Sequence, residues 1–76
     1  MAELLAHLAR QLVDEPDAVE VNEVQQEGAT VLQLRVAKED VGKVIGRQGR
    51  IARALRAIVR ASGARSHRRV VLKILE

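Results

Sequence analysis

The chain has 76 residues and a formal net charge of +3, and 47% of its residues are hydrophobic, so we expect one small globular domain rather than a disordered chain. It contains no cysteine, which excludes disulfides and thiolate metal sites, and no Phe, Tyr or Trp, so its core must come from Leu, Val, Ile and Ala. No apolar run approaches the roughly 20 residues that cross a bilayer and no signal-peptide pattern is present, so we expect a cytosolic protein without membrane association.

The first third of the sequence predicts a helix followed by a strand. Residues 2–14 carry leucines at helical spacing: Leu4, Leu5, Leu8 and Leu12. Pro16 ends this helix, because a proline pushes the preceding residue out of the helical region. Residues 18–25 contain three valines whose spacing slips from odd to even, which indicates a bulge or an early end of the strand.

The middle of the sequence predicts a hairpin and then a short helix. A turn at residues 27 and 28 leads into a clearer strand over residues 30–36. One face of this strand consists of Leu32, Leu34 and Val36. A short helix follows, with an apolar side made of Val41, Val44 and Ile45. Asp40 or Glu39, just before this helix, is placed to cap its free backbone amides.

The last part predicts an arginine-rich helix and a final strand. The helix runs to about Ser62, with Gly63 just past its end. Its predicted apolar stripe consists of Ile51, Leu55, Ile58 and Val59. The opposite side gathers Arg50, Arg53, Arg56 and Arg60. After a loop over residues 66–68, alternating apolar residues from Val70 to Ile74 predict a strand.

This order of elements predicts an α+β fold of the form αββααβ over one domain, residues 1–76. The first two strands are joined by a tight turn and should pair antiparallel. The connection from residue 36 to residue 70 contains both later helices, so the last strand should lie parallel to the second. We therefore expect a three-stranded mixed sheet with helices packed on one face.

The stretch from Gly46 to Ile51 predicts a binding site for an anion. Two glycines three positions apart allow a tight turn and a close approach of backbone to ligand. The next helix begins there, and the free amides at a helix start favour negative charge. Arg47 and Arg50 add two positive charges at the same point. This combination suits the sugar-phosphate backbone of a nucleic acid.

The distribution of charge along the chain favours the same partner. Residues 1–40 carry nine acidic and three basic side chains, a net charge of −6, whereas residues 41–76 carry ten basic and one acidic side chain, a net charge of +9. A basic run by itself is more often a solvated helix face. Here the basic half also contains the glycine turn, which favours a polyanion as the partner.

The run from Val41 to Ile51, in which an isoleucine precedes G-x-x-G between two helices, resembles the signature of the KH-domain family. A helix and strand at about 2–25 precede a core at about 29–76, which resembles the type II arrangement of that family. The GXXG loop clamps a few nucleotides through their backbone, so the resemblance implies binding of single-stranded RNA. Similarity to the small bacterial RNA-binding members of the family further implies an RNA chaperone and post-transcriptional regulator. Such a protein acts with a larger KH-domain partner and is linked to cell-wall homeostasis and cell length.

The resemblance also implies which residues contact RNA. These are Lys43, Ile45, Gly46, Arg47, Gln48, Gly49, Arg50 and Ile51, with Arg53 and Arg56 as secondary basic contacts. In this scheme Lys43 and Arg50 reach phosphates, and Ile45 and Ile51 line an apolar groove for bases, with Val44 as a further candidate. A solvated helix face is an equal alternative for the secondary contacts. Because no aromatic side chain is available for base stacking, we expect modest affinity and weak sequence preference.

Other polar residues predict no further site. The bases Arg65, Arg68 and Arg69 should lie roughly 20 Å from the glycine turn, beyond a helix of about 13 residues, and general electrostatic attraction or solubility explains them best. We expect His7 and His67 on the surface. The acids Asp14, Glu15 and Asp17 surround a proline turn, so we expect no metal or cofactor. Ser62 and Ser66 lack a paired base and acid, so an enzyme is not expected.

A second hypothesis is a protein-interaction module, in which the domain mainly mediates pairing and forms a homodimer. The apolar side of the first helix, with Leu4 and Leu8, and the helices around the GXXG loop are the candidate surfaces. Pairing would double the RNA contacts of each assembly. The residues do not distinguish RNA from DNA, because phosphate clamping is common to both, and the preference for RNA comes from the family resemblance.

Overall fold

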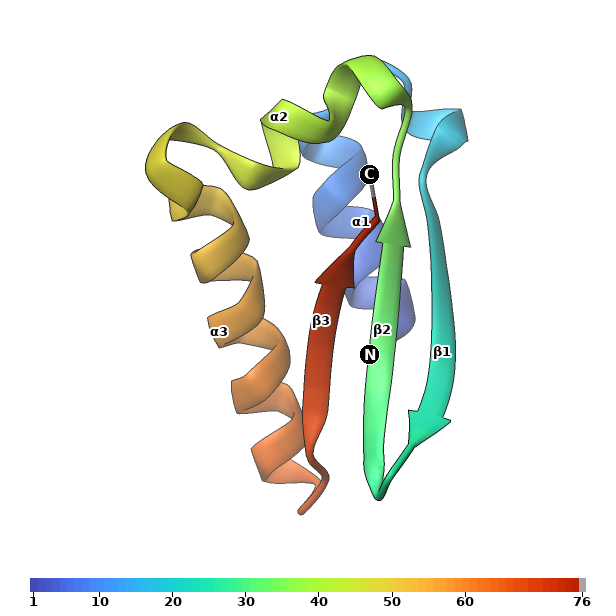
Figure 1. The fold of residues 1–76 in the computed structure, drawn as a ribbon, viewed down its shortest axis with the longest axis vertical. Coiled ribbons are helices and arrows are strands. Elements are labelled where there is room, and N and C mark those ends of the chain that lie inside the picture. The colour runs from blue at the N-terminus through green and yellow to red at the C-terminus, as the bar shows by residue number, and fades with distance from the viewer. Residues whose placement is uncertain (76) are drawn as a thin grey trace.

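A computed structural model describes residues 1–75 of the chain (Figure 1). Its helices and strands are α1 (Ala2–Leu12), β1 (Glu20–Gln26), β2 (Ala29–Arg35), α2 (Val41–Ile45), α3 (Arg50–Arg65) and β3 (Val70–Ile74). Short 3₁₀ turns at Pro16–Ala18, Lys38–Asp40 and Arg47–Gly49 connect them. The order αββααβ is the predicted one, and it confirms the α+β class.

The three strands form one mixed sheet in the order β1-β2-β3. β1 pairs antiparallel with β2, and β2 pairs parallel with β3, as predicted. The β1–β2 register runs without interruption over all seven pairs to Gln26, so the predicted bulge or early end of the strand is wrong. Val21 pairs with Leu34 and Val24 with Val31, which places the two β1 valines on opposite faces of the sheet. The slip in valine spacing is a change of face and not an extra residue.

The hydrophobic core lies between one face of the sheet and the helices. Leu32 and Leu34 of β2 are fully buried, and Leu72 of β3 lies beside them. Leu5 and Ala9 of α1 cover this face together with Leu55 and Val59 of α3. Full burial of one leucine stabilises the fold by about 1.5–3 kcal/mol. The residues between these strand positions face away from the core, so the helices cover one face only, as predicted (Figure 1).

Both long helices present a narrower buried side than predicted. In α1 the small residues Ala6 and Ala9 are buried next to Leu5, whereas Leu4 is 44% exposed. In α3, Ile58 of the predicted apolar stripe is 40% exposed. α3 packs mainly against β3, the edge strand of the sheet, so only one side of this helix is covered. Leu4 and Ile58, which helical spacing places on the apolar sides of these helices, therefore keep much of their surface exposed.

Gly63 lies inside α3 and does not end it, which corrects the prediction of a helix ending at Ser62. A Cβ atom at Gly63 would stand 2.6 Å from Cγ2 of Val70 and 2.9 Å from the carbonyl oxygen of Arg68. Glycine is needed here because the last turn of α3 passes directly against the start of β3. The turn after the helix is made by His67, which has a left-handed φ of 56°.

Candidate nucleic-acid interface

The glycine loop joins α2 to α3, and its two glycines, Gly46 and Gly49, both have a positive φ but differ in how closely their surroundings pack. Gly46 has φ 76° and ψ 173°, a region open almost only to glycine. A Cβ atom at Gly46 would stand 2.6 Å from Cγ1 of Ile51, so this glycine also allows the first turn of α3 to pack on the loop. Gly49 has φ 73° and ψ 16°, and a Cβ atom added there would have no other atom within 4 Å.

The tip of the loop is a tight 3₁₀ turn held by three hydrogen bonds. The backbone N–H of Gly49 donates to the carbonyl of Gly46 at 3.1 Å, and that of Arg50 donates to the carbonyl of Arg47. Gln48 takes the left-handed conformation, with φ 57°. Its carbonyl accepts a hydrogen bond of 2.6 Å from Nη2 of Arg53. The turn therefore exposes the side chains of Arg47 and Gln48 at the beginning of α3.

The apolar residues beside the loop differ in their burial. Ile45 and Ile51 are half-buried, so each keeps some surface on which a base could rest. Val44 is 0% exposed and belongs to the hydrophobic core. The inclusion of Val44 among the groove residues is therefore wrong, because its side chain is buried in the hydrophobic core.

Lys43 lies between two carboxylates that precede the loop. Its Nζ donates to Oδ2 of Asp14 at 2.7 Å and to Oδ1 of Asp40 at 3.1 Å. Asp40 is 1% exposed, and its Oδ2 accepts a hydrogen bond of 3.0 Å from the backbone N–H of Glu15. No side chain caps α2, so the prediction that Asp40 or Glu39 caps this helix is wrong. The Asp40 carboxylate binds the backbone after α1 instead.

The charges at this junction shift each other's pKa values. Burial alone would raise the pKa of Asp40, but hydrogen bonds from Lys43 and from the backbone of Glu15 and Asp14 outweigh it and lower that pKa. Hydrogen bonds to Asp14 and Asp40 raise the pKa of Lys43. Both groups are therefore charged near neutral pH.

The arginines of α3 divide between the loop and a groove. Arg53 binds the loop carbonyl, as described above. Arg56 and Arg60 line a groove of about 350 Å³ that runs between α3 and β3. Arg68 and Arg69, at the start of β3, line the same groove. Both residues follow the end of α3 that is opposite the loop, as predicted, and the groove joins them to Arg56 and Arg60 because β3 returns alongside that helix.

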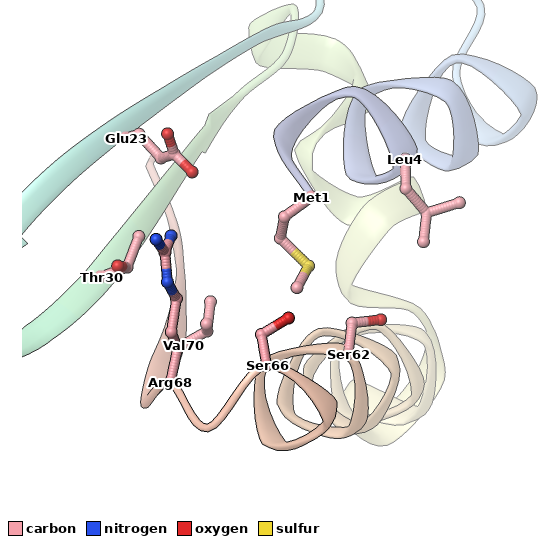
Figure 2. A pocket seen from close by; sticks show the side chains of 9 residues that line it. Met1, Leu4, Glu23, Thr30, Ser62, Ser66, Arg68 and Val70 are labelled. Atoms are coloured by element: carbon pink, nitrogen blue, oxygen red, sulfur yellow. The ribbon is translucent and has the colours of Figure 1, made fainter.

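A second hollow, of about 360 Å³, lies at the opposite end of α3 from the loop (Figure 2). Figure 2 shows Met1 and Leu4, at the start of α1, on one side and Ser62 and Ser66, at the end of α3, on the other, with Glu23, Thr30 and Val70 of the sheet to the left. Met1 is 38% exposed and Leu4 is the most exposed large apolar residue of α1. Ile58 lies one turn before Ser62 on the same side of α3. Met1, Leu4 and Ile58 are exposed large hydrophobic residues at or next to these two helices, and we refer to the three together as the α1–α3 apolar patch.

The part of the chain that the structure describes contains neither a metal-binding cluster nor a membrane-spanning helix. Residues 1–75 contain no group of three or more His, Asp or Glu side chains that could hold a metal ion. None of the helices in this range is long and apolar enough to cross a membrane. His7 and His67 are exposed, as predicted.

The family model and the relatives that match this sequence name the same family. The sequence model of the family described as KhpA/KhpB, KH domain, matches residues 2–74. A protein named RNA-binding protein KhpA from Caldanaerobacter subterraneus is 49% identical over 75 residues, which cover 99% of this chain and 100% of that protein. The protein of the same name from Treponema pallidum is 55% identical, with 97% of this chain and 92% of that one covered.

A solved structure supports the fold. The crystal structure of a variant of Aquifex aeolicus Era bound to GDP.AlF4- matches with a TM-score of 0.66 at 16% sequence identity. The match covers 96% of this chain and only 28% of the Era chain. At this identity the likeness concerns the fold alone.

Proposed function

We propose that this chain, which belongs to the KhpA/KhpB family of KH-domain proteins, binds single-stranded RNA through its Gly46–Gly49 loop and the adjoining side of α3. Relatives that match nearly its whole length are named RNA-binding proteins. The observation that carries the proposal is the loop itself. Its tight turn, with Gln48 and Gly49 both left-handed, exposes Arg47 at the beginning of a 16-residue helix.

The charges around the loop support this assignment. In residues 1–75 the salt bridges are the two formed by Lys43, so the arginines of the loop and of α3 have no carboxylate within 4.0 Å among these residues. We propose that Arg47 and Arg50 hold phosphates at the loop, together with backbone amides around Gly46 and Gly49. The secondary contacts are Arg53 and Arg56, and the groove that Arg56 lines extends the basic surface along β3.

The half-buried Ile45 and Ile51 would receive the bases, and Gln48 would face the strand at the tip of the loop. We leave Lys43 out of the phosphate contacts because its ammonium already lies between two carboxylates. With no aromatic side chain in the sequence, binding should depend on the backbone and show weak sequence preference.

The test is a titration of a short single-stranded RNA at several salt concentrations. If Arg47, Arg50 and Arg56 displace three counterions, the logarithm of the affinity should fall with the logarithm of the salt concentration at a slope of about −2. A slope near zero would contradict the phosphate contacts. The same oligonucleotide made of DNA shows whether the site distinguishes the two sugars.

A double substitution, Arg47→Asp with Gln48→Asp, should abolish measurable binding. The chain offers a matched control, because Arg10-Gln11 on α1 is also an exposed Arg-Gln pair. Arg10→Asp with Gln11→Asp changes the net charge equally but lies outside the site, so it should weaken binding only slightly. Equal losses in the two variants would show that only net charge matters.

The finer role is also a proposal. By family membership we propose a cytoplasmic RNA chaperone and post-transcriptional regulator that acts with the larger KH protein KhpB, also called Jag or EloR, and contributes to cell-wall homeostasis and cell length. The match to a family model shared by KhpA and KhpB supports the pairing. Co-purification of the two proteins from the same organism tests the partner, and an assay of RNA strand annealing tests the chaperone role.

The α1–α3 apolar patch favours pairing of two chains as a second function. Leu4 and Ile58 are 44% and 40% exposed, although both carry large apolar side chains. Light scattering should show a dimer that becomes a monomer in Leu4→Lys or Ile58→Lys. The control is Val71→Lys, because Val71 is equally exposed, at 42%, but belongs to β3. A wild-type monomer at all concentrations that binds RNA tightly would argue against this second function.

A further inference from the structure

The helix that leads into the RNA-binding loop is too short to hold itself in place. α2 has five residues, and isolated helices shorter than about 12 residues are marginal in water. Gly46 follows directly, and its backbone N–H donates to the carbonyl of Gly42 in α2 at 2.9 Å. The orientation of the loop therefore depends on whatever holds α2.

Two sets of contacts hold α2. Val44 enters the hydrophobic core and is fully buried. Asp40, at the start of α2, accepts a hydrogen bond from the backbone N–H of Glu15, 25 positions earlier, and a second from Nζ of Lys43. Lys43 also reaches Asp14, 29 positions earlier. The carboxylate and the ammonium thus connect α2 to the backbone between α1 and β1.

The two carboxylates of this connection have different environments. Asp40 is 1% exposed, so its charge needs the partners that surround it. Asp14 is 76% exposed and forms the outer half of the connection. Hydrogen bonds from Lys43 and from backbone N–H groups keep the pKa of Asp40 low despite its burial. Loss of Lys43 would leave a buried carboxylate with fewer partners at the base of the loop.

We propose that Asp40 and Lys43 are positioning residues for the RNA-binding loop, and that Lys43 acts on RNA through the orientation of α2 and not by contact with a phosphate. The proposal rests on the RNA-binding function proposed above. The geometry supports it, because Nζ of Lys43 already donates to carboxylates at 2.7 and 3.1 Å. A phosphate that approached this ammonium would also meet two negative charges.

Salt dependence separates a positioning residue from a phosphate contact. For a single-stranded RNA, Lys43→Met should weaken binding about three- to tenfold and leave the slope of log affinity against log salt unchanged. Arg47→Ala should instead reduce that slope by about 0.7, the value for one phosphate contact to a single strand. Lys38→Met is the matched control, since this exposed lysine lies outside the connection and should change neither quantity.

Asp14→Asn should change RNA affinity in opposite directions for the two possible roles of Lys43, as a positioning residue or as a phosphate contact. If Lys43 positions α2, removal of the outer carboxylate should leave binding unchanged or slightly weaker. If Lys43 contacts phosphate, the same change frees its ammonium and should tighten binding. Tighter binding by Asp14→Asn, a reduced slope in Lys43→Met, or wild-type affinity in folded Lys43→Met would each overturn the proposal.

Hydrogen exchange tests the connection without RNA. In Lys43→Met the backbone amides of residues 46–50 should exchange at least several-fold faster, whereas those of Leu55 and Val59 in the buried part of α3 should keep their protection. Unchanged exchange at the loop would refute the positioning role. If Arg47→Ala binds RNA like the wild type, the proposed function fails, and this exchange measurement still decides whether Lys43 holds the loop.

Discussion

The two glycines of the loop should differ in their importance for stability, although both are glycines of one motif. Alanine at Gly46 meets two penalties. Its φ of 76° and ψ of 173° lie in a region that costs a non-glycine residue about 1–3 kcal/mol. Its Cβ would stand 2.6 to 2.9 Å from three side-chain atoms of Ile51, an overpacking that costs about 1–3 kcal/mol more.

Alanine at Gly49 meets only the first kind of penalty. The left-handed conformation costs about 1–2 kcal/mol, and nothing lies within 4 Å of the added atom. In both variants the smaller entropy of the unfolded chain returns about 0.4–1 kcal/mol. The net losses are therefore about 3 kcal/mol for Gly46→Ala and about 1 kcal/mol for Gly49→Ala. For a domain of this size, the difference corresponds to roughly 8–16 °C in Tm.

Urea and thermal unfolding followed by far-UV circular dichroism measure these losses. The wild type and the two alanine variants should be compared in one buffer. If Gly49→Ala is as destabilising as Gly46→Ala, the contact with Ile51 does not have the energy assigned to it. A double-mutant cycle with Ile51→Ala tests that contact. Alanine removes Cγ1 and Cδ1 of Ile51 but keeps its Cβ atom 2.9 Å from the added atom, so the Gly46→Ala penalty should shrink by only part of the about 1–3 kcal/mol assigned to overpacking.

Two further predictions concern the helices and the acid limit of stability. Gly63→Ala should destabilise the protein by about 1–3 kcal/mol, because the added Cβ would stand 2.6 Å from Cγ2 of Val70. Gly42→Ala should instead stabilise α2 by about 0.4–1 kcal/mol, because the added Cβ has nothing within 4 Å. Equal effects of the two variants in thermal unfolding would contradict this difference. The pKa of Asp40 is lowered from its ordinary value of 3.8, so its contribution to stability is complete above that pH and is lost as the pH falls through the lowered pKa. Unfolding curves between neutral pH and about pH 2 should therefore show a smaller acid loss in Asp40→Asn than in the wild type, and parallel curves would contradict the assignment.

The sequence by itself determined the secondary structure, the sheet topology and the position of the loop. The alternation of Leu32 and Leu34 with polar or half-buried neighbours identified the central strand, because successive side chains of a strand face opposite sides. The two-helix connection implied a parallel last strand, and the structure confirms it. Gly46 and Gly49 marked the turn because few other residues adopt a positive φ. These properties depend on near neighbours and on chain connectivity.

Only the tertiary structure decided which partners the side chains meet. Lys43 resembles a free cation in the sequence, yet it lies between Asp14 and a buried Asp40. Helical periodicity placed Leu4 and Ile58 on the apolar sides of their helices, yet both are exposed. The buried side of α1 consists of Leu5, Ala6 and Ala9, and α3 covers an edge strand. The contacts of Lys43 with Asp14 and of Asp40 with Glu15 join residues that lie 25 or more positions apart, and the exposure of Leu4 and Ile58 depends on how far a helix extends over a sheet. Neither is encoded in local spacing.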